Sequence, residues 1–330
     1  MDLSHLRDSP IFICGHPKSG TTLVRAILDS HPQLVVYPDE SSFFQGFVFE
    51  VADRSPDKKL SLAQRYLLHF FEAENGSREQ LYTTYARTCD IMCQLIENIG
   101  YRHDGDLLSA AILAYGQAHD LLTPESCHWV EKTPYNEFYA DDIYALWPEA
   151  YCIHIVRDPR DNYTTYYRKH QTLEIEKFAL GWNASLKVGL HNQNRFGSKR
   201  YLILRYEDLT QDPGGQISLI VDFLGIRDDK SLRLPSRGGV AWQGNSMFGD
   251  KFTDISKKPL ERWKQYLSPQ DAGRIEVLCG SLMKKMGYSY QKRLNFGQYL
   301  RVIYWSFKQA REVPSVVTKA LKRNFGVLPR

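Results

Sequence analysis

The sequence predicts a three-layer α/β fold, a central parallel sheet flanked by helices, with a helical insertion and a C-terminal helical extension. Short apolar runs, typical of strands buried on both faces, recur along the chain at residues 11–14, 34–37, 128–130, 151–156 and 201–205. Helical patterns alternate with these runs, which favours parallel strands covered on both faces. The apolar fraction of 43% is enough for one sizeable core.

The first strand leads through a turn into a helix. After residues 11–14 comes a glycine-bounded turn, and residues 21–30 then carry apolar side chains at helical spacing. His31-Pro32 ends this helix, because the residue before a proline disfavours helical backbone. After the last predicted strand, Asp212-Pro213-Gly214 indicates a turn before another helix at residues 217–224.

We expect one domain over residues 1–290, with a helical insertion at about 58–122, where helical patterns alternate with turn signals. Residues 228–258 are rich in glycine, serine and lysine, which is typical of a long functional loop. Residues 291–330 alternate basic and apolar side chains. Two interpretations of this extension stay open: a basic amphipathic helix in peripheral contact with an anionic membrane, or a helix docked on the domain.

Composition and charge narrow the classes of function. A formal net charge of +4 gives no case for a nucleic-acid-binding protein, but it suits an enzyme that draws a small anion into one positive cleft. Six scattered cysteines form no CxxC pair, which favours reduced thiols, no metal and a cytoplasmic location. The N-terminus lacks the pattern of a signal peptide, and no run approaches the ~18–20 apolar residues of a membrane span.

The turn between the first strand and its helix is the first candidate binding site. Backbone N–H groups and the helix dipole converge on an anion at such a turn, which predicts a P-loop-like fold. The candidate phosphate-binding residues are His16, Pro17, Lys18, Ser19, Gly20, Thr21 and Thr22. A P-loop kinase, the main alternative, would carry lysine where Thr21 stands and aspartate where Arg157 stands, so magnesium-dependent kinase chemistry is disfavoured.

These residues resemble those of the sulfotransferase superfamily. PKSGTTLVRAILDSHP, at residues 17–32, resembles the family's 5′-phosphosulfate loop and following helix, in the pattern of its bacterial and tyrosylprotein branches. IVRDPRD, at residues 155–161, resembles its 3′-phosphate site, where a strand-end arginine and a later hydroxyl hold a terminal phosphate. Arg157 and Thr165 stand at the matching positions, although most relatives carry serine in place of Thr165. The late RKG motif of the cytosolic branch is absent.

The resemblance extends over about residues 10–287. In the block EKTP it implies that Lys132 faces the sulfuryl group, and in the block YEDL that Tyr206 packs on an adenine. In the predicted loop, Ser246 would place a hydroxyl on the donor. The implied donor is 3′-phosphoadenosine 5′-phosphosulfate (PAPS), the product is adenosine 3′,5′-bisphosphate, and no metal is required.

The implied reaction is in-line sulfuryl transfer to a hydroxyl or amine, catalysed by positioning and charge stabilisation. Lys18 and Lys132 are expected to stabilise the charge that grows on the leaving bisphosphate. The tyrosylprotein branch keeps a catalytic glutamate after its second strand, where this chain has Asp39 and Glu40. We favour Glu40, because the following residues look like the start of a helix that lines the cleft.

The acceptor is not identified by the sequence. A small molecule, a glycan and a lipid all stay open, as does the oligomeric state. His128 and His170 stay open as alternative bases. A non-catalytic nucleotide-binding protein on the same fold would be expected to lack Lys18, Arg157 or Lys132, which are all present.

Overall fold

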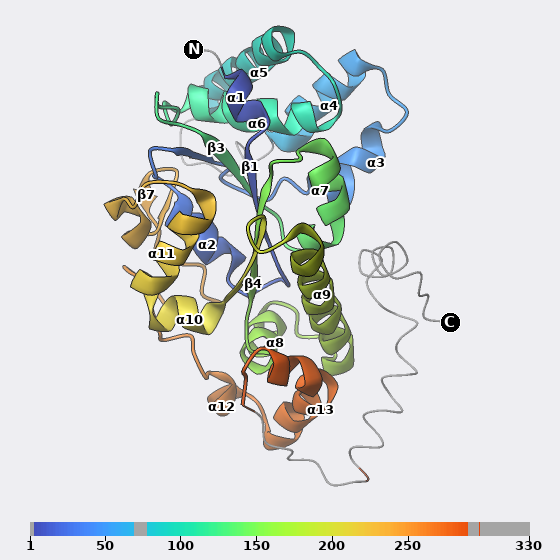
Figure 1. Cartoon of the computed structure of the whole chain (residues 1–330), viewed down its shortest axis with the longest axis vertical. Coiled ribbons are helices and arrows are strands. Elements are labelled where there is room, and N and C mark those ends of the chain that lie inside the picture. Colours follow the sequence, from blue (N-terminus) through green and yellow to red (C-terminus); the bar gives the residue numbers. More distant parts are fainter. Residues whose placement is uncertain (1–2, 69–77, 290–296, 298–330) are drawn as a thin grey trace.

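The computed structural model describes residues 3–68, 78–289 and 297, and at its centre lies a five-stranded parallel sheet (Figure 1). The strands follow the order β2-β3-β1-β4-β5. Their bounds are β1 Pro10–Cys14, β2 Leu34–Val36, β3 His128–Lys132, β4 Tyr151–Val156 and β5 Tyr201–Arg205. The α/β class and the parallel sheet are therefore confirmed, with all five predicted strands present.

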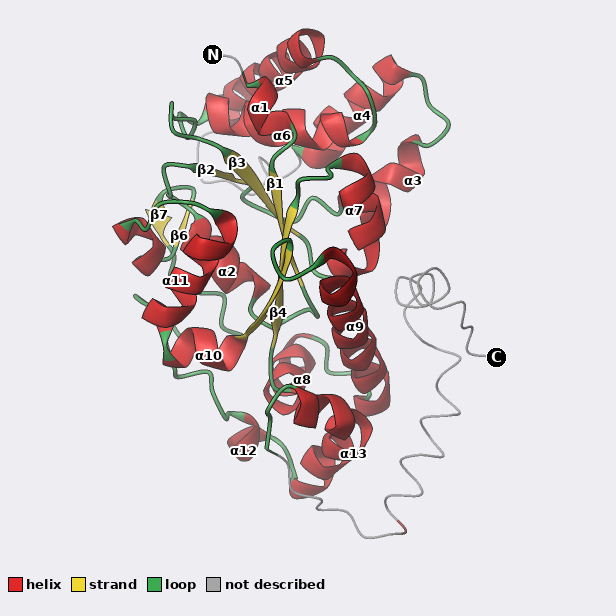
Figure 2. Ribbon diagram, viewed as in Figure 1, coloured by secondary structure: helices red, strands yellow, loops and turns green. Residues whose placement is uncertain are grey.

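Helices cover both faces of this sheet. Ile11 and Ile13 of β1 join a core with α2, α10 and α11, whereas Phe12 and Cys14 join a second core with α4 to α7. Figure 2 shows α2 and α11 on one side of the sheet and α7 and α9 on the other. The α-helices are α1 Ser4–Arg7, α2 Thr21–Leu28, α3 Val48–Val51, α4 Pro56–Leu67, α5 Arg78–Ile99, α6 Gly105–Ala118, α7 Ala140–Leu146, α8 Pro159–Lys169, α9 Ile175–Phe196, α10 Tyr206–Gln211, α11 Pro213–Leu224, α12 Trp263–Tyr266 and α13 Pro269–Lys285.

The ends of β3 and α2 are among those that differ from the sequence expectation. β3 continues past Val130, because Glu131 and Lys132 pair with β1 in parallel register, and this carries polar side chains to the end of a buried strand. α2 ends at Leu28, since Asp29 is extended and Ser30 has a positive φ of 65°. The first difference concerns function, because Lys132 is a predicted catalytic residue.

The strand order creates a crevice at the carboxyl ends of β1 and β4. These two strands are neighbours, yet the chain leaves β1 toward β2 on one side and β4 toward β5 on the other. Ligands of open α/β sheets bind at such a switch point. The glycine-bounded turn follows β1 and Arg157 follows β4, so the topology brings the two predicted phosphate sites together.

The predicted insertion is helical where it is described, in α4, α5 and α6. α6 is buried along most of its length and packs on β2, so it belongs to the core. Residues 228–258 include a hairpin that the sequence analysis missed, β6 (Ser236–Arg237) and β7 (Val240–Ala241). The predicted extension at 291–330 lies outside the described residues, apart from Gly297. Of the helices that the structure describes, none is long and apolar enough to cross a bilayer.

Candidate active site

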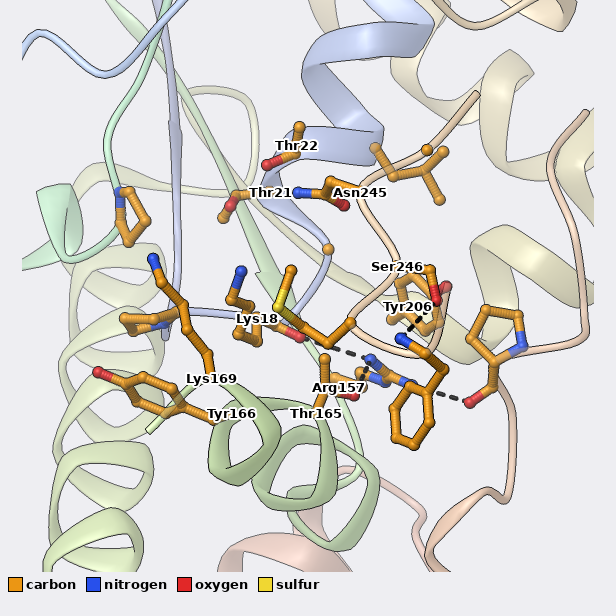
Figure 3. A pocket seen from close by; sticks show the side chains of 18 of the residues that line it. Lys18, Thr21, Thr22, Arg157, Thr165, Tyr166, Lys169, Tyr206, Asn245 and Ser246 are labelled. Carbon is orange, nitrogen blue, oxygen red and sulfur yellow. Dashed lines mark hydrogen bonds between the residues drawn. The ribbon is translucent and has the colours of Figure 1, made fainter. Parts of the chain in front are cut away.

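A cavity of about 380 Å³ opens where the turn after β1 meets the end of β4 (Figure 3). It brings together predicted residues from distant parts of the chain: Pro17, Lys18, Gly20, Thr21, Thr22, Glu40, Arg157, Thr165, Tyr206 and Ser246. The other predicted residues lie outside its lining: His16, Ser19, Asp39 and Lys132. Lys132 contacts the cavity through Glu40, with which it forms an ion pair.

The phosphate loop, residues 15–22, depends on two glycines. Gly15 and Gly20 have φ values of +135° and +113°, which other residues rarely adopt. A Cβ at Gly15 would lie 2.4 Å from the carbonyl oxygen of Ile155, and one at Gly20 would lie 2.5 Å from the ring of Tyr206. The loop therefore fits tightly against β4 and α10, and it delivers the N-terminus of α2 to the cavity, as an anion site requires.

Buried polar side chains hold this loop from the side of the core. The Gly15 N–H donates to the Glu137 carboxylate at 2.8 Å, and burial raises the pKa of Glu137 to about 7. Asn162 donates to the carbonyl of Pro17 at 2.9 Å, while its side-chain oxygen lies 2.8 Å from Nδ1 of His16. Burial lowers the pKa of His16 to about 4, so its imidazole is neutral at pH 7. His16 thus faces the core, and only its backbone is available to the cavity side of the loop.

The guanidinium of Arg157 is the second candidate anion-binding group. It donates to the Thr165 hydroxyl at 3.2 Å and to the carbonyl of Pro259 at 2.8 Å, and it lies 4.6 Å from the centre of the Tyr206 ring. Its Nε and the hydroxyl of Ser19 are buried atoms without a hydrogen-bond partner among the described residues. Buried donors of this kind normally have partners, and a phosphate beside Arg157 would supply one to its guanidinium. The donor set therefore fits a nucleotide with separate phosphates.

Lys132 and Glu40 form an ion pair at the wall of the cavity. The side chain of Lys132 is 4% exposed and that of Glu40 is 45% exposed, so the pair lies at the boundary between the protein interior and the opening of the cavity. Burial lowers the pKa of Lys132, and the Glu40 carboxylate opposes this effect. Lys18 lines the same cavity, and burial lowers its pKa too. Asp39 instead accepts the N–H of Glu40 at 2.9 Å and lies outside the lining.

Glu131, which the sequence analysis did not single out, fixes the backbone beside Glu40. Its buried carboxylate accepts four hydrogen bonds, two from Ser41, one from Thr133 at 2.5 Å and one from Asn136 at 2.6 Å. Burial raises the pKa of Glu131 above its usual value, and these hydrogen bonds offset part of that rise. Because Ser41 follows Glu40, this network ties the loop after β2 to the end of β3. It is therefore a positioning device for the ion pair.

Further lining residues come from segments without a recognisable motif. Tyr166 and Lys169 follow Thr165 on α8, and Lys169 could have been identified because it stands one helical turn after that hydroxyl. Asn245 lies in residues 228–258, where only a functional loop was predicted, and Arg262 directly precedes α12. Ser246 donates its hydroxyl to Asp250 at 2.7 Å, and Arg262 binds the same carboxylate at 2.5 Å. This segment closes one wall of the cavity.

The chemistry of the site differs from that of a nucleotide kinase. The residue directly after β4 is Arg157, and Thr21 begins α2. Within the described part of the chain, no group of three or more His, Cys, Asp or Glu side chains is placed to hold a metal ion. The arrangement offers two candidate anion-binding groups with an ammonium–carboxylate pair nearby.

Comparisons with known proteins agree with this geometry. The sequence pattern described as the Sulfotransferase family matches residues 10–230. Protein-tyrosine sulfotransferase A of Caenorhabditis elegans is 26% identical, over 70% of this chain and 54% of that protein. Carbohydrate sulfotransferase 4 of Mus musculus is 23% identical, over 55% of this chain and 59% of that protein. The chain thus spans little more than half the length of these relatives.

A solved structure shows the same fold. The sulfotransferase domain from the Synechococcus PCC 7002 olefin synthase superposes with a TM-score of 0.55 and 20% identity, over 86% of this chain and 96% of that domain. The family pattern includes the phosphate loop, the Lys132 block and the Arg157 block. The chain therefore belongs to the sulfotransferase family.

Proposed function

We propose that this protein is an enzyme that transfers a sulfuryl group from PAPS to a hydroxyl or amine of an acceptor. One observation carries the proposal: the phosphate loop, the Arg157–Thr165 pair and the Lys132–Glu40 pair all meet at a single cavity. Two phosphate sites suit the two ends of an adenosine bisphosphate. The neighbouring ion pair supplies a group to stabilise charge and a group to accept a proton.

Each part of the donor has a candidate binding residue. The loop with Lys18 and the N-terminus of α2 would hold the 5′-phosphosulfate, and Arg157 with Thr165 would hold the 3′-phosphate. The Tyr206 ring, stacked on Arg157, would contact the adenosine, and Ser246 would approach the donor from the segment before α12. The bound donor supplies an activated sulfuryl group, whose bond to the phosphate oxygen breaks as the acceptor oxygen or nitrogen bonds to sulfur.

The chain's own groups assist at defined atoms. Nζ of Lys132 and Nζ of Lys18 would stabilise the negative charge that develops on the leaving phosphate oxygen. The carboxylate of Glu40 would accept the acceptor's proton, and its ion pair with Lys132 holds it at the wall of the cavity. Asp39 is less suited to this role, because its carboxylate faces the backbone of Glu40 outside the cavity.

The location and the range of acceptors are also proposals. All six cysteines lie in the described residues as free thiols, which supports a reducing compartment such as the cytoplasm. A small molecule, a glycan or a lipid is a compatible acceptor.

Peripheral membrane contact through residues 291–330 would be tested by liposome sedimentation of the full chain and of a chain that ends before Leu294. Unchanged binding after truncation would rule out that contact.

Calorimetric binding of adenosine 3′,5′-bisphosphate, compared with ATP and Mg²⁺, tests the donor. We expect micromolar binding of the bisphosphate and a loss of about 10- to 100-fold in Arg157→Ala, because charge-assisted hydrogen bonds to the phosphate disappear. Arg195→Ala is the matched control, since Arg195 is a half-exposed α9 residue that pairs with Asp141 away from the cavity. Tight ATP–Mg²⁺ binding without any response to the bisphosphate would overturn the proposal in favour of a kinase.

A further inference from the structure

A second cavity, of about 330 Å³, adjoins the first at Glu40. Its lining, called here the acceptor chamber, consists of Glu40, Ser41, Ser42, Glu50, Leu62, Arg65 and Tyr66. The volume lies at the lower end of the ~300–1,000 Å³ range of small-molecule sites. Glu40 lines both cavities, so a molecule in the chamber can present one group to the proposed base.

We propose that the acceptor chamber binds an uncharged, polyhydroxylated acceptor of monosaccharide size, such as a hexose or the terminal sugar of a glycan. The inference rests on the proposed function, because the bound hydroxyl would give its proton to Glu40 and receive the sulfuryl group. It selects one class from the small molecules, glycans and lipids that the sequence left open.

The chemistry of the lining favours hydroxyl groups over apolar groups. Six of its seven side chains carry a carboxylate, a guanidinium or a hydroxyl, and Leu62 is the exception. Carboxylates accept hydrogen bonds, a guanidinium donates them, and hydroxyls do both. Glu40 and Ser41 already bind Lys132 and Glu131, so an acceptor would mainly meet Ser42, Glu50 and Arg65. A sugar ring offers both donors and acceptors around its edge, whereas a lipid chain or an aryl ring would desolvate these groups without replacing their hydrogen bonds to water.

The charge of the lining argues against an anionic acceptor. Glu40 is already paired with Lys132, which leaves Glu50 and Arg65 as one charge of each sign. An acidic peptide or a phosphorylated acceptor would therefore meet no net positive charge in the chamber. Glu50 and Arg65 are both exposed, so the chamber opens to solvent and a longer glycan could continue outward.

The shape of the chamber depends on the predicted insertion and on one glycine. Leu62, Arg65 and Tyr66 project from α4. η1 (Phe43–Phe47), a π-helical turn of the kind found frequently at functional sites, contacts α4. A Cβ at Gly46 of this turn would lie 2.1 Å from the hydroxyl of Tyr66, so Tyr66 occupies its position only because residue 46 is glycine. α4 thus has a role that the sequence analysis did not assign.

The test measures sulfuryl transfer from radiolabelled PAPS to three probes: methyl β-D-glucopyranoside with its galactose and mannose counterparts, 2-naphthol, and an acidic tyrosine-containing peptide. We expect at least one glycoside to be the best substrate by kcat/KM. In Glu50→Gln and Arg65→Gln, the glycoside KM should rise at least 10-fold with kcat within about 3-fold, because these groups bind the acceptor without contacting the transferred group. Bisphosphate affinity should not change in either variant.

Lys58→Gln is the matched control, since Lys58 is an exposed residue of the same helix outside the chamber. A preference for naphthol or the peptide overturns the inference, and so do Glu50 and Arg65 variants that behave like this control. Bisphosphate binding without sulfation of any glycoside overturns the acceptor class alone. Absence of bisphosphate binding overturns the proposed function, and the inference with it.

Discussion

The donor end and the acceptor end of the site are built from different kinds of structure. At the donor end, the phosphate loop and Arg157 each follow directly on a buried strand of the sheet, next to one another in space. At the acceptor end, Glu40 lies in a loop, and Tyr66 and its neighbours lie on α4 outside the sheet. The donor end is therefore fixed by backbone geometry, whereas the acceptor end is fixed by side-chain contacts between distant segments.

This difference suggests how one fold serves several acceptors. A strand-end loop with two required glycines tolerates little change, because a Cβ at either one would meet Ile155 or Tyr206. A chamber lined by side chains of α4 can change its chemistry one residue at a time. We therefore expect substitutions at the acceptor end to alter KM for the acceptor, and substitutions at the donor end to alter bisphosphate binding.

The largest effect is expected for Lys132→Met, at the junction of the two ends. Loss of one well-placed donor to a developing charge costs ~2.7–4 kcal/mol of barrier, so kcat should fall about 10²- to 10³-fold. Steady-state sulfuryl transfer measures this, with Lys169→Met as comparator because Lys169 lines the cavity without pairing to Glu40. A kcat for Lys132→Met within tenfold of wild type would remove Lys132 from the mechanism.

A donor-end carboxylate should link folding stability to pH. The pKa of Glu137 is raised by burial from 4.5 to about 7. Between these values the folded protein holds a proton that the unfolded chain has released, so its free energy of unfolding falls as pH rises through this window. In Glu137→Gln this loss should be absent. Relative to wild type, the variant should gain about 3 kcal/mol between pH 4.5 and pH 8.

Urea unfolding of both proteins across pH 4.5–8 checks this sign. The carbonyl oxygen of glutamine can still accept the Gly15 N–H, so the phosphate loop should keep its shape. Glu149→Gln serves as control, because the Glu149 side chain is 71% exposed. Parallel stability curves for wild type and Glu137→Gln would mean that Glu137 is ionised throughout this range.

At the donor end, the sequence pattern that predicts an anion-binding loop is local. Glycine, lysine and threonine in a turn between an apolar run and a helix define an anion site within a few positions. Arg157 directly follows an apolar run in the same way. The loop was identified from its own neighbours in the chain, whereas the role of Arg157 came from the resemblance to the sulfotransferase family. The parallel topology places the two segments side by side.

The contacts of the acceptor end were harder to predict from the sequence, because they join residues that are far apart in the chain. Nothing in the sequence near Glu40 shows that its partner is Lys132, 92 positions away. The choice between Asp39 and Glu40 depended on a one-residue alignment, and only the three-dimensional arrangement shows which carboxylate lines the cavity. Glu131 looked like a polar residue at a strand end, yet β3 extends through it and buries it.

A smaller effect is expected at the acceptor end, for Glu131→Gln. The carboxylate accepts the amide of Asn136, and a glutamine would turn an N–H group toward that donor. Leaving one buried donor unpaired costs about 1–3 kcal/mol of unfolding free energy. Glu131→Gln should also lower kcat, because Glu131 positions the backbone beside Glu40. In the double variant Glu131→Gln with Asn136→Asp, most of the unfolding free energy, measured with urea, and most of kcat should be recovered. Failure of this rescue would indicate that the negative charge of Glu131, rather than its hydrogen bonds, is required.

The smallest effect is expected for Ser246→Ala, at the wall formed by the segment before α12. The Ser246 hydroxyl is already donated to Asp250, which also binds Lys258 and Arg262, so the wall keeps most of its contacts without it. A single hydrogen bond to a nucleotide phosphate is worth about 1.5–3 kcal/mol only where the donor is free to point at it. We expect bisphosphate affinity in calorimetry to fall less than tenfold, well below the loss in Arg157→Ala. A loss as large as that of Arg157→Ala would show that this wall, and not only the strand ends, defines the donor site. The donor end would then depend on side-chain contacts between distant segments, as the acceptor end does.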